Sequence, residues 1–361
     1  MGTELTTVIG GKFYVGIGVA IVAIIGLLVY FMANMEKNEI ITNEGQNTDN
    51  LNSSSLQLVQ TIPLPNVSGR IDHMDIELNG QRLFVAEIEN NSLDILDLKE
   101  GKRLHTINGL HSPQGVAFVP DLNKIVVANG GDGSVQIFDS DTYSLVNTIP
   151  LSSDADNARY NPSQKLVYVG FGNGGLAIID PAKGELVDNI KLDGHPESFQ
   201  ISDELQPRIF VNVPESDSVE VIDTQKKAVA VKWSNDGAEG NYPMALDVDS
   251  HRLFVGYREP SELHVIDTDS GKVISKVPIN GDPDDIFYDR QNGEIYISDG
   301  QGFVDVITEQ GNDYHVIAKI KTENGARTSL FVPQLNRLYV AIPDYSGDGA
   351  KIQVFETHKI Q

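Results

Sequence analysis

A pattern of about 40 residues recurs along most of the chain and constrains its fold more than any other feature. It is clearest over Leu166–Ile190, where two apolar strands flank a glycine turn, the second ends in Asp180, and a third strand follows a turn containing Pro, Gly and Lys. Such a unit is most of a small antiparallel sheet, and this period is typical of a propeller blade. Seven such repeats predict an all-β, seven-bladed β-propeller.

The aligned repeats predict where the central strands lie. The second strands of the seven repeats are Arg82–Ala86, Lys124–Ala128, Leu166–Gly170, Arg208–Asn212, Arg252–Gly256, Glu294–Ser298 and Arg337–Ala341. The third strands end at Asp97, Asp139, Asp180, Asp223, Asp267, Thr308 and Glu356. Because a carboxylate before a tight turn accepts backbone N–H groups there, the five aspartates at one register predict a structural role.

The seventh repeat has no outer strand of its own, since the chain ends soon after Glu356. At the other end of the repeats, Ser55–Ile62 resembles the outer strand Tyr143–Ile149 of the second repeat. We therefore expect this N-terminal segment to complete the seventh blade and close the ring, which would remove an open sheet edge.

An uncharged apolar run at Phe13–Ala33 predicts a single transmembrane helix. It is too long for the core of a cleaved signal peptide, and its end lacks a good cleavage site. The predicted organisation is a short tail at 1–12, the membrane helix at 13–33, a flexible polar linker at 34–54 and the propeller at 55–361.

The charges around the apolar run favour a propeller on the extracytoplasmic side. Basic residues are balanced, with Lys12 before the run and Lys37 after it, whereas several carboxylates follow it. The N-x-S sequons at Asn52, Asn66 and Asn90 are compatible with that location. The localisation predicted from the sequence is therefore the cell membrane, in a single pass.

Composition disfavours nucleic-acid binding and excludes cysteine chemistry. A net charge of -24 would repel nucleic acid over most of the surface, so no nucleic-acid partner is expected. Cysteine is absent, which excludes thiolate metal sites and cysteine nucleophiles.

The motif Tyr168–Gly170, followed by Ile178–Asp180 and Gly184, resembles the YVTN-repeat β-propeller family of archaeal surface-layer and bacterial periplasmic proteins. The resemblance extends over about Ser55–Glu356. It implies an extracytoplasmic seven-bladed propeller, and it supplies no set of catalytic residues.

The starts of the innermost strands are the candidate binding site, because loops from all blades converge at the central channel of a propeller. The aligned positions are Asp72–His73, Gln114–Gly115, Asp156–Asn157, Glu197–Ser198, Pro243–Met244, Asp284–Asp285 and Arg327–Thr328. We predict ligand contacts from Asp72, His73, Gln114, Asp156, Asn157, Glu197, Asp284, Asp285 and Arg327, with Arg70, His111 and His195 as further candidates. Strand alternation leaves open which member of each pair faces the channel.

Two functions fit this pattern. The first is a membrane-anchored module that binds a small molecule or a protein at the cell surface. The second is a lactonase- or lyase-like enzyme, in which a histidine or carboxylate acts as general base and Arg327 steadies an oxyanion. His73, His111, His195, Glu197 and Asp285 are of the types that bind a divalent metal, but linear spacing assigns no metal ligands and no catalytic residue.

Overall fold

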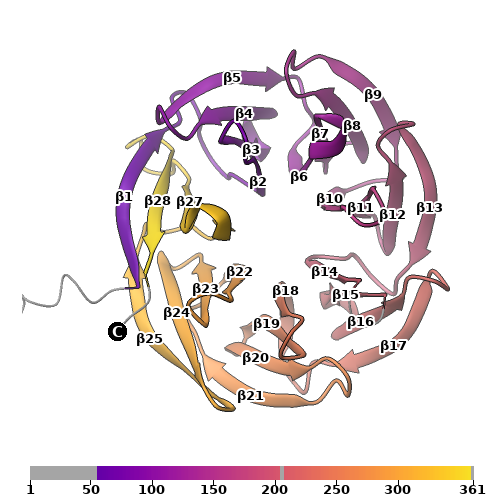
Figure 1. Cartoon of the computed structure of the whole chain (residues 1–361), viewed down its shortest axis with the longest axis vertical. Helices are drawn as coiled ribbons and strands as arrows, with labels where there is room; N and C mark the ends of the chain where they lie inside the picture. Colours follow the sequence, from indigo (N-terminus) through magenta and orange to yellow (C-terminus); the bar gives the residue numbers. More distant parts are fainter. Residues whose placement is uncertain (1–54, 204–206, 359–361) are drawn as a thin grey trace, which may run out of the picture. The chain divides into compact units, whose positions relative to one another are not determined.

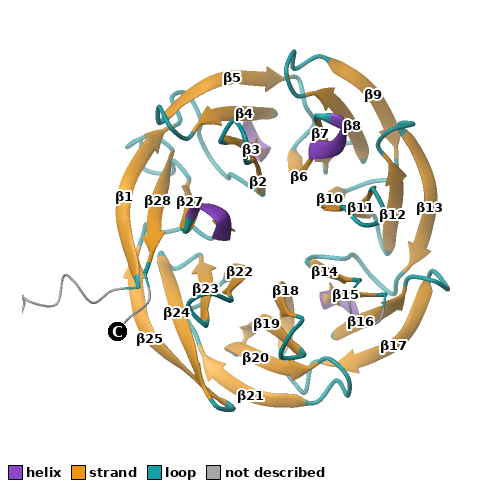
Figure 2. Ribbon diagram, in the orientation of Figure 1, coloured by secondary structure: helices purple, strands orange, loops and turns teal. Residues whose placement is uncertain are grey.

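The repeat predicted from the sequence is present in the computed structural model, which describes residues 55–203 and 207–358. The strands form seven four-stranded antiparallel sheets, set as blades around a common centre (Figure 1). The prediction of an all-β seven-bladed propeller is confirmed. Apart from short 3-10 helices, the described residues are strands and loops (Figure 2).

Each of the first six blades runs from its inner to its outer strand in chain order. Blade 1 is β2 (Met74–Glu77), β3 (Arg82–Glu87), β4 (Ser92–Asp97) and β5 (Lys102–Asn108); blade 2 is β6 (Pro113–Val119), β7 (Lys124–Asn129), β8 (Ser134–Asp139) and β9 (Leu145–Pro150); blade 3 is β10 (Ala155–Asn161), β11 (Leu166–Phe171), β12 (Gly175–Asp180) and β13 (Glu185–Lys191). Blade 4 is β14 (Phe199–Ser202), β15 (Arg208–Val213), β16 (Ser218–Asp223) and β17 (Ala228–Ser234); blade 5 is β18 (Glu239–Asp247), β19 (Arg252–Glu259), β20 (Ser261–Asp267) and β21 (Val273–Pro278); blade 6 is β22 (Pro283–Asp289), β23 (Glu294–Asp299), β24 (Phe303–Gln310) and β25 (Asp313–Lys321). The 3-10 helices are η1 (Ile88–Asn90), η2 (Pro120–Leu122), η3 (Pro214–Ser216) and η4 (Pro333–Leu335).

Blade 7 is built from both ends of the propeller sequence. It contains β26 (Ser329–Val332), β27 (Arg337–Ile342) and β28 (Lys351–Thr357), and its outer strand is β1 (Leu56–Pro63). β1 is antiparallel to β28, with Leu56 opposite Thr357 and Pro63 opposite Lys351. The segment predicted to complete the seventh blade therefore occupies that place.

Every outer strand carries a β-bulge at the same register. The extra residue in each is Val59, Leu104, Val146, Val187, Ala230, Ile274 or Ile317. Several of these apolar side chains are exposed, as are neighbours such as Leu145 and Leu186. A bulge twists the outer edge away from regular strand geometry, so it protects an exposed apolar edge from pairing with another chain.

The aspartates that end the third strands of blades 1 to 5 have the predicted structural role. Each of them accepts N–H groups from the turn that follows, as Asp180 does from Ala182 and Lys183. The Lys183 ammonium group, followed by these N–H contacts, stabilises the ionised form and holds the pKa of Asp180 below its ordinary value.

Residues 1–54, with the predicted tail, membrane helix and linker, lie outside the described residues. Within residues 55–203 and 207–358, no helix is both long and apolar enough to cross a membrane. The domain boundaries and the membrane anchor stay predictions.

The β1 pairing leads to a direct test of stability. Ile62 of β1 is fully buried, whereas Leu58 of the same strand is 47% exposed. We expect Ile62→Ala to lower the free energy of unfolding by about 2–5 kcal/mol, because it leaves a cavity in the core. Leu58→Ala is the matched control and should change it by less than about 0.5 kcal/mol. Equal effects of the two substitutions in chemical denaturation would contradict this arrangement of β1.

Candidate functional site

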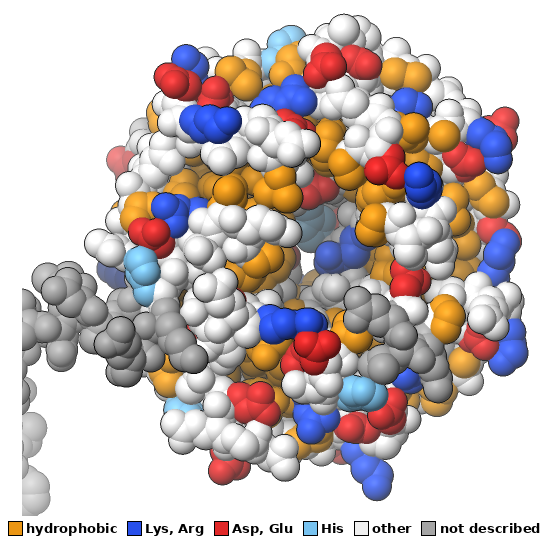
Figure 3. Space-filling view, in the orientation of Figure 1, with side chains coloured by type: hydrophobic (Ala, Val, Ile, Leu, Met, Phe, Trp, Pro, Cys, Tyr) orange, Lys and Arg blue, Asp and Glu red, His pale blue; other side chains and the backbone are white. Residues whose placement is uncertain are grey.

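A ring of seven side chains, of five residue types, surrounds the start of the inner strands, one from each blade. Its members are Asp72, Gln114, Asp156, Glu197, Tyr242, Asp284 and Arg327. Most of them line a cavity of about 280 Å³, with Arg70, Asp154, His195 and Arg258. We call this cavity, its lining and the adjoining carboxylates of Asp72 and Asp282 the channel mouth. Figure 3 shows the propeller from the face opposite the channel mouth, with a hollow at its centre and charged and histidine side chains inside it.

The second members of the predicted pairs do not line this cavity. His73, Asn157 and Asp285 follow the ring residues along their strands, and the Asn157 amide lies 3.2 Å from Nε2 of His73. Asp285 accepts the backbone N–H of Ser329 in the next blade at 2.8 Å. In blades 2, 3, 4, 6 and 7 it is the first member of the pair that lines the cavity.

Two arginines and two aspartates form a network on one side of the channel mouth. The guanidinium group of Arg258 contacts Asp282 at 2.9 Å and Asp284 at 2.7 Å. Arg327 contacts the other oxygens of the same two carboxylates, at 2.8 and 3.2 Å. Arg258 also stacks 3.6 Å from the centre of the Tyr242 ring. Both guanidinium charges are thus compensated within the protein.

The opposite side of the mouth places a histidine among carboxylates. His195 lies 3.8 Å from Asp154 and 3.6 Å from Asp156, and its Nδ1 lies 2.6 Å from the Gly172 carbonyl, to which a protonated Nδ1 donates. Burial lowers the pKa of His195, but Asp156 and the Gly172 carbonyl outweigh it and raise the pKa to about 9. The imidazole is therefore a charged donor at neutral pH.

Asp72 connects the ring with the second members of the pairs, such as His73. Its side chain is almost fully buried and makes an ion pair with Arg70 at 2.9 Å. Burial raises the pKa of Asp72 to about 6, although His73 and Arg70 act in the opposite direction. For His73 burial lowers the pKa, but the carboxylates of Asp72 and Asp285 outweigh it and leave the pKa raised.

Glu197 differs from the other carboxylates of the mouth because its side chain has no ion pair or hydrogen bond with any of the described residues. Burial, reinforced by the nearby charge of Asp156, raises the pKa of Glu197 to about 7. Burial likewise raises the pKa of Asp285 to about 7. An unpaired carboxylate in the cavity wall is free to bind a cationic group or a hydrogen-bond donor.

The mouth as a whole is acidic. Six carboxylates are set against three guanidinium groups and the His195 imidazolium; they belong to Asp72, Asp154, Asp156, Glu197, Asp282 and Asp284. Because the arginines already contact aspartates, an incoming anion would have to displace those contacts. A ligand that carries positive charge faces no such competition at Glu197.

The structure separates one candidate from the rest. His111 is 59% exposed, lies 3.7 Å from Asp132, and does not line the channel mouth. The structure therefore does not bring His111, in the loop before β6, together with the other candidates. Among the described residues, no three His, Asp or Glu side chains are grouped closely enough to hold a metal ion.

In blade 5 the sequence alignment placed the mouth at the wrong residue. Met244 was aligned with the mouth, but it is buried in the core between blades 4 and 5, and Tyr242 lines the cavity instead. The register shift in β18 between Asn241 and Met244 also occurs in β6 and β10, where Gln114 and Asp156 hold the position equivalent to Tyr242. The sequence alignment of blade 5 was therefore one residue too far toward the C-terminus.

Four further mouth residues were missed by the sequence reasoning. Asp154 and Asp282 lie just before β10 and β22 with positive φ values of 41° and 61°, so strand alternation gave no signal for them. Arg258 and Tyr242 gave no signal either. Arg258 lies at the end of β19, which is longer than the second strands of the other blades.

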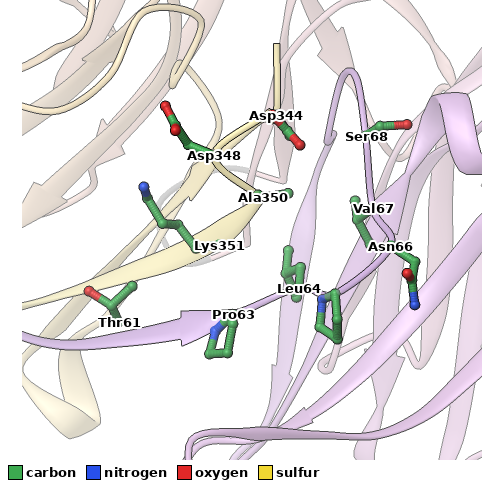
Figure 4. A pocket seen from close by; sticks show the side chains of 12 residues that line it. Thr61, Pro63, Leu64, Asn66, Val67, Ser68, Asp344, Asp348, Ala350 and Lys351 are labelled. Atoms are coloured by element: carbon green, nitrogen blue, oxygen red, sulfur yellow. The ribbon is translucent and has the colours of Figure 1, made fainter. Parts of the chain in front are cut away.

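Another cavity, of about 400 Å³, lies away from the mouth between the segment after β1 and the loop that joins β27 to β28. Its lining includes Asn66, Ser68, Asp344, Asp348 and Lys351 (Figure 4). No sequence pattern had pointed to it.

Comparison with known proteins gives one family. The family model described as outer membrane protein assembly factor BamB matches residues 66–277. An uncharacterized WD repeat-containing protein of Synechocystis is 32% identical over 100 residues, which are 27% of this chain and 26% of that protein. The matched segment thus spans about a quarter of that relative.

Solved propellers share the fold at low identity. A chain of Kuenenia stuttgartiensis hydrazine synthase has a TM-score of 0.70 and 18% identity, covering 82% of this chain and 98% of its own. A chain of the mitotic checkpoint complex has a TM-score of 0.72 and 13% identity, covering 89% of this chain and 98% of its own. The WD40 repeats of RRP9 have a TM-score of 0.72 and 8% identity, covering 84% of this chain and 100% of their own.

The raised pKa of Glu197 predicts how stability depends on pH. Its folded value of about 7 lies above the value of about 4.3 in an unfolded chain, so folding disfavours the ionised form. The free energy of unfolding of the wild type should fall relative to that of Glu197→Gln as pH rises from about 4 to 7. Above pH 7 the difference between the two proteins should stay constant. We expect the variant to be more stable by about 1–2 kcal/mol at pH 8.

Urea denaturation at several pH values measures this difference. Glu239→Gln is the control, since Glu239 is an exposed carboxylate at the start of β18. A Glu197→Gln variant that is less stable than wild type at pH 8 would show that Glu197 is a structural residue.

Proposed function

The chain belongs to the family described as outer membrane protein assembly factor BamB, and from this membership we propose that it is a propeller module that binds a partner protein at its channel mouth. A propeller with this family assignment fits protein binding. The ring of different residues at the mouth supports a specific contact surface, because a purely structural repeat would keep similar residues at one register.

The unpaired Glu197 is the observation that carries the proposal. It lies in a cavity wall where the neighbouring arginines are already compensated by Asp282 and Asp284. We propose that a basic side chain of the partner enters the mouth and pairs with Glu197 and Asp156. Such a charge-assisted contact in a partly buried site is specific and favourable.

We further propose that this module is anchored in the cell membrane, with the propeller on the extracytoplasmic side. The uncharged run at Phe13–Ala33 and the carboxylates that follow it support this placement. The resemblance to YVTN-repeat proteins of archaeal surface layers and bacterial periplasms points to the same side.

The lactonase- or lyase-like alternative has less support. It requires Arg327 to steady an oxyanion, but both sides of that guanidinium group are engaged by Asp282 and Asp284. A substrate oxyanion would have to displace at least one of these carboxylates, and six carboxylates around the mouth oppose its approach.

Site-specific photo-crosslinking tests the binding face. A photoreactive amino acid at Gln114 of the mouth should form a covalent adduct with a protein in intact cells that express the full chain. The same residue at Lys226 is the control, because that exposed turn after β16 lies on the opposite face.

Charge reversal then tests the role assigned to Glu197. Glu197→Lys should reduce the Gln114 adduct at least about tenfold, because one lost charged contact in a partly buried site costs 1.4 kcal/mol or more. Glu100→Lys changes the net charge equally but lies on the opposite face, so it should leave the adduct unchanged. Adducts at Lys226 and none at Gln114 would overturn the proposal.

A further inference from the structure

The chain contains N-x-S sequons at Asn52, Asn66 and Asn90, and the proposed function uses none of them. Asn66 and Asn90 lie among the described residues, in two neighbouring segments of the same face. Ser68 is hydrogen-bonded to Asn90, at 2.7 Å through its carbonyl and 3.3 Å through its N–H. The two sequons therefore share an environment but differ in how their own side chains are engaged.

Asn66 is presented to solvent. It occupies an exposed turn after β1 with a φ of 65°, a conformation that asparagine tolerates better than most residues. The next residue, Val67, is 4% exposed and packs in the core formed by blades 7 and 1. Ser68 is exposed again. The buried valine thus holds the sequon at the surface, at one side of the cavity lined by Asn66 and Ser68 (Figure 4).

The carboxamide of Asn66 makes no hydrogen bond with any residue in the described ranges, and the Ser68 hydroxyl likewise makes none. Both groups that a glycosyl-transferring enzyme reads in a sequon are therefore available in the folded protein.

In the Asn90 sequon, by contrast, both side chains are hydrogen-bonded. Its Nδ2, the atom that would accept a sugar, donates to the Ser68 carbonyl at 2.7 Å. The hydroxyl of Ser92, the third residue of that sequon, is 3% exposed and donates to the buried Glu87 carboxylate at 2.5 Å. Modification at Asn90 would require β4 to separate from the blade, whereas Asn90 as it stands fixes the position of Ser68.

We propose that Asn66 is the N-glycosylation acceptor of the folded propeller and that Asn90 is not. In this reaction Nδ2 of Asn66 forms a bond to the anomeric carbon of a sugar, while the bond from that carbon to a phosphate oxygen of a polyprenyl-linked donor breaks. The phosphate leaves with the bonding electrons, and the nitrogen loses a proton to a base of the transferring enzyme. In cells this inference rests on the proposed extracytoplasmic location.

Transfer to the folded chain in vitro tests the structural part. The full chain, purified in detergent, is incubated with an oligosaccharyltransferase that accepts N-x-S and its lipid-linked donor, and site occupancy is measured by mass spectrometry. We expect at least tenfold more glycan on Asn66 than on Asn90. After denaturation the Asn90 peptide should become modified, which shows that its sequence is acceptable.

Two variants sharpen the result. Ser68→Ala should abolish modification of Asn66, and because the Ser68 backbone still contacts Asn90 the fold should be kept. Asn90→Asp should leave Asn66 occupancy in the folded chain within a factor of two. Equal occupancy of Asn66 and Asn90 in the folded chain, or an unmodified Asn66 that is modified once denatured, would overturn the proposal.

Occupancy in cells is read together with the location of the propeller. The chain has no cysteine, so Lys226→Cys gives a unique thiol for a maleimide that does not cross membranes. Labelling in intact cells with glycan on Asn66 supports both inferences. Labelling without glycan on Asn66 overturns the acceptor assignment and leaves the location standing. No labelling and no glycan overturn the location and, with it, modification in cells.

Discussion

The antiparallel pairing of β1 with β28 is the interaction on which the arrangement of the blades depends. It brings the first strand of the propeller into the same sheet as the last, with Leu56 opposite Thr357. The core next to this pairing contains Ile62 from β1, Leu83 from blade 1 and Tyr339 from blade 7. At the mouth, the Thr328 hydroxyl donates to the Ile71 carbonyl at 3.1 Å, so blades 7 and 1 also meet there.

The propeller fold tolerates different residue types at the mouth. Because apolar strands maintain every blade, with turn aspartates in blades 1 to 5, the ring position is free to be Asp, Gln, Glu, Tyr or Arg without loss of the fold. The result is a cavity in which Arg258 and Arg327 are compensated by aspartates while Glu197 is not. The uneven distribution of charge, more than any single residue, gives the mouth its preference for a cationic partner group.

The sequence predicted the blades, the segment that completes blade 7 and the structural aspartates, because each depends on local periodicity and turn chemistry. It also located most of the mouth, since the ring residues share one register. It did not predict Tyr242, because the alignment of blade 5 was one residue too far along, although β18 has the same register shift as β6 and β10. Arg258 was missed for a different reason: it reaches Asp282 and Asp284 across blades, and such a contact depends on how neighbouring sheets pack.

Hydrogen exchange of the full chain, compared between isolated cell membranes and the purified protein, tests binding at the mouth most directly. If a partner occupies the mouth, backbone amides in 154–158 and 194–198 should exchange at least several-fold more slowly in membranes. Amides in the turns of the opposite face, such as 224–227, should exchange equally in both samples. Slower exchange on that face, with no change at the mouth, would contradict the account.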